Sequence, residues 1–103
     1  MSRGRRLYER IDLAFPVQVE HEQRRFEAVT RNISLGGIYL VTDERLEPGA
    51  STRLTFRLPD LDRPTACEGI VRWRGPDGYG LQFGSLRAID VWGINQLFRK
   101  RSA

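Results

Sequence analysis

Six short segments of this chain have the composition of β-strands, and four of them alternate apolar and polar residues. In residues 14–20, for example, Val17 and Val19 alternate with Gln18 and Glu20. Successive side chains of a strand point to opposite faces of a sheet, so this period of two predicts strands with one buried face. The expected strands are 14–20, 26–31, 38–42, 53–58, 67–74 and 79–84, with turns between them. Such a chain is expected to form a barrel or a sandwich.

The period changes after the last expected strand. Residues 86–100 contain no proline, and their apolar side chains recur at helical spacing. These side chains are Leu86, Val91, Ile94, Leu97 and Phe98. Ser85 is expected to cap the start of this helix. The predicted fold class is therefore all-β dominated, with six strands and a C-terminal α-helix that covers one open end.

Size and composition bound the class of protein. The chain has 103 residues, which suits one domain, and 40% of them are hydrophobic. No apolar run approaches the roughly 18 residues that span a bilayer, and the N-terminus does not resemble a signal peptide. The single cysteine, Cys67, fits a reducing compartment. We therefore expect a cytoplasmic protein without a membrane span.

Positive charge is concentrated at the two ends of the chain. The formal net charge is +4, yet residues 1–10 and residues 99–103 each carry a net charge of +3. Residues 11–98 carry ten arginines against twelve acidic residues. A nucleic-acid-binding domain more often carries a basic stripe across a folded face, so this distribution argues against nucleic acid as the partner.

The basic N-terminus contains an R-x-x-x-R motif, formed by Arg6 and Arg10 and preceded by Arg5. Arginine makes bidentate bonds to phosphate and to the N7/O6 edge of guanine, and its guanidinium plane can stack on a base. Alone, the motif fits a solvated basic tail equally well.

A second motif, N-x-S-x-x-G, follows about 20 residues later and consists of Asn32, Ser34 and Gly37. Its short polar side chains can reach a base edge or a phosphate, and its glycine lets the backbone approach a ring. Alone, the motif is more typical of a turn, because these residue types dominate turns.

Together, the two motifs and the strands around them resemble the PilZ domain, a bacterial receptor module for cyclic di-GMP. The resemblance extends to Gly69 and Trp73 and to the segment 80–83. It implies a six-stranded antiparallel barrel with a C-terminal helix in residues 13–100, a flexible basic arm in residues 1–12 and a short tail in 101–103. It also implies how the ligand is held. The expected ligand-binding residues are Arg5, Arg6, Arg10, Asn32, Ser34 and Gly37, with Gly36, Trp73 and Gly80 at the rim.

The resemblance also implies a stoichiometry. An arginine at the position of Arg5 accompanies two intercalated ligands in the proteins that this chain resembles, so two cyclic di-GMP molecules are expected per chain. Arg5 as part of a solvated tail remains the alternative.

The residues argue against an enzyme. His21 is the only histidine and is expected in an exposed turn, whereas Cys67 is expected in the core. No histidine and cysteine cluster has metal-ligand spacing, and no cofactor is expected. We expect a stand-alone cyclic di-GMP receptor that changes conformation and acts through an unidentified downstream protein. The alternative is a PilZ-like adaptor that binds protein or nucleic acid without nucleotide.

Overall fold

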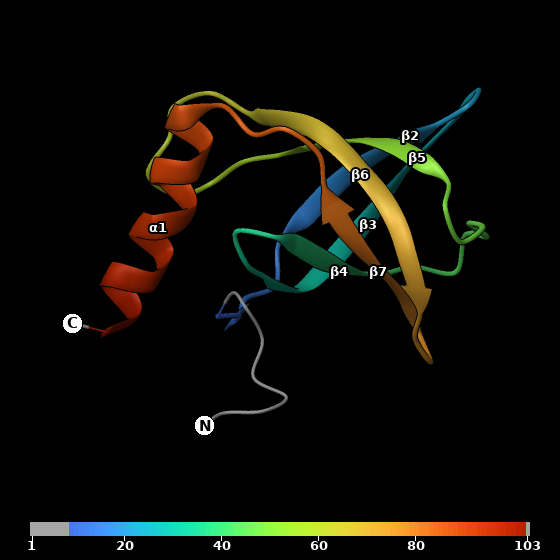
Figure 1. Cartoon of the computed structure of the whole chain (residues 1–103), viewed down its shortest axis with the longest axis horizontal. Coiled ribbons are helices and arrows are strands. Elements are labelled where there is room, and N and C mark those ends of the chain that lie inside the picture. The colour runs from blue at the N-terminus through green and yellow to red at the C-terminus, as the bar shows by residue number, and fades with distance from the viewer. Residues whose placement is uncertain (1–8, 103) are drawn as a thin grey trace.

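The computed structural model describes residues 9–102, and its seven strands form one antiparallel sheet (Figure 1). The strands are β1 (Ile11–Asp12), β2 (Pro16–His21), β3 (Arg24–Ile33), β4 (Gly37–Val41), β5 (Ser51–Phe56), β6 (Thr65–Arg74) and β7 (Gly78–Phe83). Their order is β1-β3-β2-β5-β6-β7-β4, and an additional β3–β4 pairing closes the last six into a barrel. The predicted six-stranded antiparallel barrel is confirmed. Of the two architectures expected from the strand pattern, the structure is a barrel and not a sandwich.

The short strand β1 was not predicted. Ile11 and Asp12 pair with Ile33 and Asn32 at the end of β3, outside the ring of six strands. The sheet thus begins inside the segment expected to be an arm, and residues 1–8 of that arm lie outside the described residues. His21 also differs from expectation: it ends β2 instead of lying in the turn, and its side chain is partly buried.

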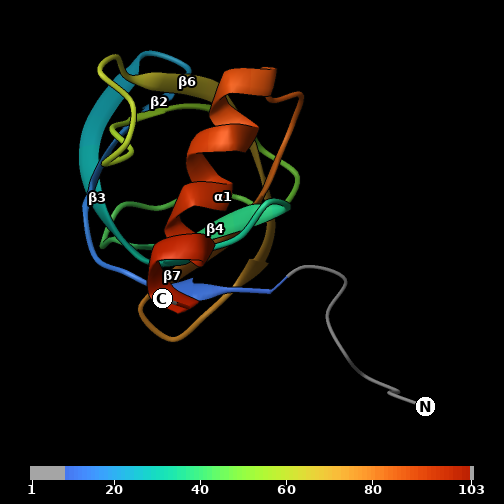
Figure 2. The ribbon, with the colours of Figure 1, turned by 90° about the vertical axis from the view of Figure 1, so that its left-hand side faces the viewer.

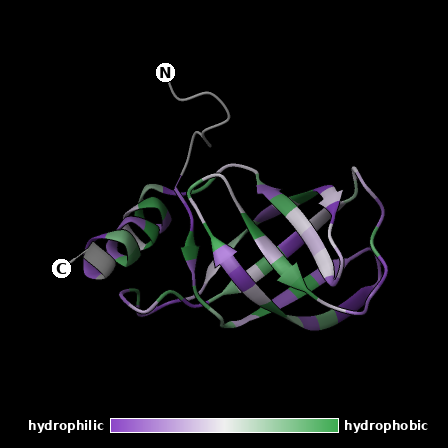
Figure 3. Cartoon of the chain, turned by 90° about the horizontal axis from the view of Figure 1, so that it is seen from below, coloured by the Kyte–Doolittle hydropathy of each residue, from purple (hydrophilic) through white to green (hydrophobic). Residues whose placement is uncertain are grey.

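Alternating side chains of the strands fill the barrel. Along β2 the burial alternates residue by residue, so that Val17 and Val19 face inward, and along β5 Leu54 does the same. Figure 3 shows the resulting alternation of hydrophilic and hydrophobic residues along the strands. Cys67 is buried as predicted, and this burial raises the pKa of its thiol to about 11. The thiol is therefore protonated at neutral pH, as expected of a core residue.

The C-terminal helix α1 (Ala88–Ser102) lies across one open end of the barrel (Figure 2). Its buried residues Ile94 and Leu97 belong to the same core cluster as Leu58 and Leu61 of the loop after β5. The predicted cap at Ser85 is wrong, because the helix begins three residues later. The carbonyl of Arg87 instead accepts the first helical hydrogen bond, from Val91. The helix also includes residues 101 and 102, which were expected to be a tail.

A buried aspartate attaches the first turn of α1 to the barrel. Asp90 is only 1% exposed. Its Oδ1 accepts a hydrogen bond of 2.8 Å from Thr65 Oγ1 at the start of β6, and its Oδ2 accepts one of 3.0 Å from Arg87 Nε. At the other end of the helix, Lys100 Nζ donates to Asp60 Oδ1 at 2.6 Å. The helix is thus held to the barrel by polar contacts at both ends and by apolar packing between them. It is too short and too polar to cross a membrane, and the described residues form no other helix.

Candidate ligand-binding site

The two sequence motifs meet at one edge of the barrel. Arg10 Nη1 donates a hydrogen bond of 2.6 Å to Asn32 Oδ1. The pairing of Asp12 with Asn32 explains this contact, because it leads the chain past the end of β3 directly after Arg10. One residue from each motif is therefore in place, whereas Arg5 and Arg6 lie outside the described residues.

Ser34 shapes the turn between β3 and β4. Its side chain is nearly inaccessible at 3% exposure. Its Oγ accepts hydrogen bonds from the amides of Gly36 at 3.1 Å and Gly37 at 3.2 Å, and its own amide donates to the Gly37 carbonyl at 2.9 Å. Ser34 lies in the predicted site, and its contacts in this structure are with the turn itself.

Gly37 allows β4 to lie close to β7. A Cβ atom at this position would lie 2.2 Å from the carbonyl oxygen of Leu81, which is closer than real Cβ atoms approach. The neighbouring Gly36 carbonyl accepts a hydrogen bond of 2.9 Å from the amide of Phe83. The glycines thus fix the backbone of the motif against the adjacent strand.

Trp73 is a half-exposed aromatic side chain at 49% exposure, and it lies over Gly80. A Cβ atom on Gly80 would lie 2.2 Å from Trp73 Nε1, so only glycine leaves room for the indole in this position. Trp73 also packs against Tyr39, with ring centroids 5.2 Å apart. The indole is thus held in place while much of its surface stays open to solvent. Trp73 and Gly80, both expected at the rim of the site, thus lie against each other beside the turn between β3 and β4.

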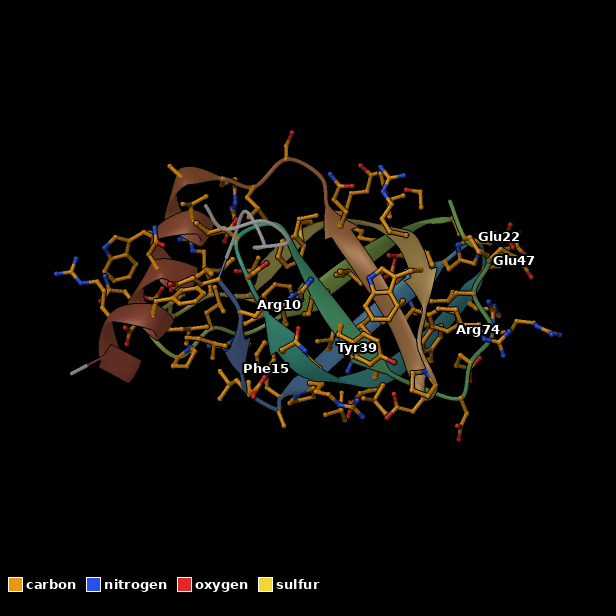
Figure 4. All side chains as sticks on the ribbon, turned by 60° about the horizontal axis from the view of Figure 1, so that its bottom comes forward. Arg10, Phe15, Glu22, Tyr39, Glu47 and Arg74 are labelled. Carbon is orange, nitrogen blue, oxygen red and sulfur yellow. The ribbon has the colours of Figure 1, made fainter. Side chains whose placement is uncertain are left out.

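These residues line a groove with two lobes, both of which include Arg10 and Trp73. The first lobe has a volume of about 490 Å³ and the second about 360 Å³. The first lobe also includes Ser34, Gly36, Gly37, Arg72, Gly80 and Gln82. The second also includes Arg31, Asn32, Tyr39 and Pro76. Figure 4 shows Arg10 on the same side of the barrel as Tyr39, which belongs to β4. Every described residue predicted for the site or its rim therefore lines one of the lobes.

Two further arginines, which neither sequence motif includes, also line this groove. The strand registers shift between Thr30 and Asn32 and between Val71 and Trp73, so that Arg31 and Arg72 lie at β-bulges. Bulges redirect side chains and often occur beside functional sites. Arg72 lines the first lobe, where its Nε donates to Gln82 Oε1 at 2.7 Å, and Arg31 lines the second. The signal available in the sequence was the position of each arginine directly before a predicted site residue.

Two more residues that were missed, Tyr39 and Asp77, hold Arg31. Arg31 Nη2 donates to Asp77 Oδ2, and its guanidinium carbon lies 5.3 Å from the centroid of the Tyr39 ring. The Tyr39 hydroxyl donates to Asp77 Oδ1 at 2.8 Å. This hydrogen bond, together with Arg31, holds the pKa of Asp77 below its ordinary value, and Asp77 is therefore a carboxylate at neutral pH.

The groove combines three arginines with an exposed indole, and this combination fits a planar ligand that carries negative charge. Arginine binds phosphates through forked, charge-assisted hydrogen bonds, and an indole face stacks on a nucleobase. Among the described residues, no group of three or more histidine, cysteine, aspartate or glutamate side chains could hold a metal ion. The groove thus offers cationic and aromatic groups for a ligand of the nucleotide class.

A small closed barrel with a helix over one end and a cationic groove beside β4 defines the class of this protein. The model of the PilZ domain matches residues 4–99, and the chain belongs to that family. No curated protein matches the chain in sequence at a significant level.

Solved structures support the assignment of the fold. The Bacillus subtilis inhibitor of motility MotI/DgrA is 30% identical with a TM-score of 0.80; the match covers 95% of this chain and 51% of that one. The chain thus spans about half the length of MotI. The PilZ domain of CeSA from a cellulose-synthesizing bacterium is 14% identical with a TM-score of 0.68, and the match covers 92% of this chain and 99% of that domain. The Borreliella burgdorferi protein PlzA, in complex with c-di-GMP, is 12% identical with a TM-score of 0.71. This match covers 89% of this chain and 40% of PlzA.

Proposed function

We propose that this protein is a cytoplasmic receptor for cyclic di-GMP. The observation that carries the proposal is the contact between the two motifs, Arg10 with Asn32, at a groove that both Arg10 and Trp73 line. Membership of the PilZ family and the c-di-GMP complex of PlzA support the choice of ligand.

The roles of the residues follow from their chemistry. Arg10, together with Arg6 and Arg5 from the N-terminal arm, binds phosphate and the guanine N7/O6 edge. Asn32 presents an amide to a base edge, and Ser34 and Gly37 hold the turn that brings the backbone to the ligand. Trp73 supplies a face on which a guanine stacks.

Two ligand molecules per chain form part of the proposal. Two stacked cyclic di-GMP molecules bring four phosphates together, and Arg5 adds a third arginine to the R-x-x-x-R motif. Titration should give two ligands for the wild type, and Arg5→Leu should bind one. A single ligand per chain in both proteins would assign Arg5 to a solvated tail.

Signal output requires a change that another protein can detect. The arm contributes arginines to the ligand and is joined to the barrel through β1, so ligand binding is expected to change the conformation of the arm. A downstream protein would then recognise the liganded form. Amide exchange at residues 7–11 should slow on addition of ligand, and unchanged exchange would contradict this step.

Calorimetry tests the proposed ligand. Cyclic di-GMP should bind, whereas GMP and a DNA duplex should bind far more weakly. Arg10→Ala should weaken binding about 10- to 100-fold, because a charge-assisted hydrogen bond contributes roughly 1.5–3 kcal/mol. Arg25→Ala is a matched control, because it removes the same charge from an 81% exposed side chain in the β2–β3 hairpin. Equal affinities for Arg10→Ala and wild type would refute the site.

A further inference from the structure

Arg31 has a position that suits a ligand-binding residue, and neither sequence motif includes it. The β-bulge between Thr30 and Asn32 leaves Arg31 out of the regular β3–β4 register. Its side chain lines the second lobe beside Arg10 and Asn32 and is 51% exposed. The lobe that contains Asn32 therefore has a cation on β3 itself, independent of the N-terminal arm.

The present partner of Arg31 is exposed and can be replaced. Asp77, which binds the guanidinium, is itself 41% exposed. Exposed ion pairs contribute little to stability, because water solvates both charges well. A phosphate oxygen offers Arg31 the same kind of bond that the carboxylate offers. The exchange of one acceptor for the other therefore costs little.

Asp77 cannot follow Arg31 into the lobe, because other contacts hold it. The Tyr39 hydroxyl donates to its Oδ1 at 2.8 Å, and its backbone carbonyl accepts a hydrogen bond of 3.1 Å from the amide of Thr42. The carboxylate thus stays beside the lobe as a fixed negative charge. It competes with an anionic ligand for the same guanidinium.

From this geometry we infer that Arg31 is a further ligand-binding residue, which binds a phosphate oxygen of the ligand in the second lobe. Asp77 is the internal counter-ion that the phosphate displaces, and it lowers the affinity of the site. Tyr39 fixes this counter-ion in place. The inference rests on the proposed function, since it assumes that the anionic ligand is cyclic di-GMP.

Calorimetric titration with cyclic di-GMP on wild type, Arg31→Gln, Asp77→Asn and the double variant tests the inference. Arg31→Gln should weaken binding about tenfold, because one charge-assisted hydrogen bond is lost. Asp77→Asn should strengthen binding about threefold or more, because it frees Arg31 and removes a negative charge near the ligand. The strengthening should shrink in the Arg31→Gln background, since the double variant has no guanidinium to release.

The results separate this inference from the proposed function. Wild type that fails to bind cyclic di-GMP would refute both. Wild type that binds, with Arg31→Gln of equal affinity, would refute the inference alone, as would an Asp77→Asn variant that binds no tighter. A damaged fold cannot imitate the tighter binding expected of Asp77→Asn, because structural damage weakens binding and does not strengthen it. Thermal unfolding of each variant checks that the barrel is intact.

Discussion

In the described part of the chain, two arginine–aspartate pairs of similar chemistry can be compared, one beside the groove and one at the start of α1. Beside the groove, Asp77 accepts hydrogen bonds from Arg31 and from the hydroxyl of Tyr39. In the first turn of α1, Asp90 accepts them from Arg87 and from the hydroxyl of Thr65. The Asp77 side chain is 41% exposed, whereas that of Asp90 is 1% exposed.

This difference in burial assigns the two pairs different roles. Water can replace the partners of an exposed carboxylate, so the pair at Asp77 can exchange with a ligand at little cost. A buried carboxylate has no such substitute, and its loss leaves its partners unsatisfied. We therefore propose that the same three functional groups serve ligand binding at the groove, whereas at Asp90 they attach the helix to the barrel.

The largest expected effect concerns the buried pair. Asp90→Ala should lower the free energy of unfolding by about 2–3 kcal/mol, because the Thr65 hydroxyl, which is 0% exposed, loses its acceptor. The midpoint of thermal unfolding should fall by about 10 °C or more. Asp77→Ala is the matched control, with a much smaller fall expected. Equal destabilisation by both variants would remove the distinction between the pairs.

Ligand binding, unlike stability, should depend on the groove and not on the helix. Two tryptophans, one at each place, test this difference. Trp73 and Trp92 are 49% and 47% exposed, but only Trp73 of the two lines the groove, while Trp92 lies on α1. Trp73→Ala should weaken cyclic di-GMP binding about tenfold, because stacking contributes roughly 1–3 kcal/mol per base. Trp92→Ala should leave the affinity unchanged. A loss of affinity in Trp92→Ala would extend the ligand site to the helix.

Acidification should weaken the buried pair more than the exposed one. Burial alone would raise the pKa of Asp90, but the hydrogen bonds from Arg87 and Thr65 outweigh it and lower the pKa below its ordinary value. A lowered pKa stabilises the fold above the unfolded value of about 3.9, and this contribution is lost as the pH falls through the folded pKa. Urea unfolding between pH 5 and about pH 3 should therefore show a smaller loss of stability in Asp90→Asn than in wild type. Asp77→Asn should change this dependence of stability on pH less than Asp90→Asn does. A larger change in Asp77→Asn would mean that the exposed pair contributes more to stability than the buried one.

The smallest effect is expected at the far end of the helix. The Lys100 side chain is 64% exposed and that of its partner Asp60 is 21% exposed. Lys100→Met should lower the free energy of unfolding by less than about 1 kcal/mol, since exposed ion pairs contribute little. Chemical denaturation of Lys100→Met and of Asp90→Ala, measured side by side, compares the contributions of the two ends of α1 to stability. A larger loss in Lys100→Met would show that the helix is held mainly from its C-terminus.

The sequence was sufficient to predict most of the fold, because a strand that buries one face has alternating apolar and polar residues. The alternation along 14–20 and 79–84 predicted β2 and β7 within a few residues. Strand β1 was missed because two residues are too few to show a period. The cap at Ser85 was wrong because Asp90 and its buried contacts, and not a serine hydroxyl, stabilise the first turn of α1.

The residues of the candidate site that belong to a sequence motif were expected, whereas those that only the fold brings to the groove were missed. Arg10 and Asn32 were both expected, and they form a hydrogen bond. Arg31 and Asp77, 46 positions apart, become neighbours only through the closure of the barrel and a bulge. No local pattern in the sequence encodes such a contact, because it depends on the register of strands that are distant in the chain.

The turn after β3 has a consequence for how related sequences change over time. Ser34 and Gly37 satisfy the backbone and admit β7 whether or not a nucleotide is present. Natural selection for a folded barrel therefore preserves them even in a descendant that has abandoned its ligand. No such folding constraint acts on the exposed guanidinium of Arg31. In a lineage that loses the messenger, the arginines should drift first, and their presence is a better marker of a working receptor than the serine and glycine.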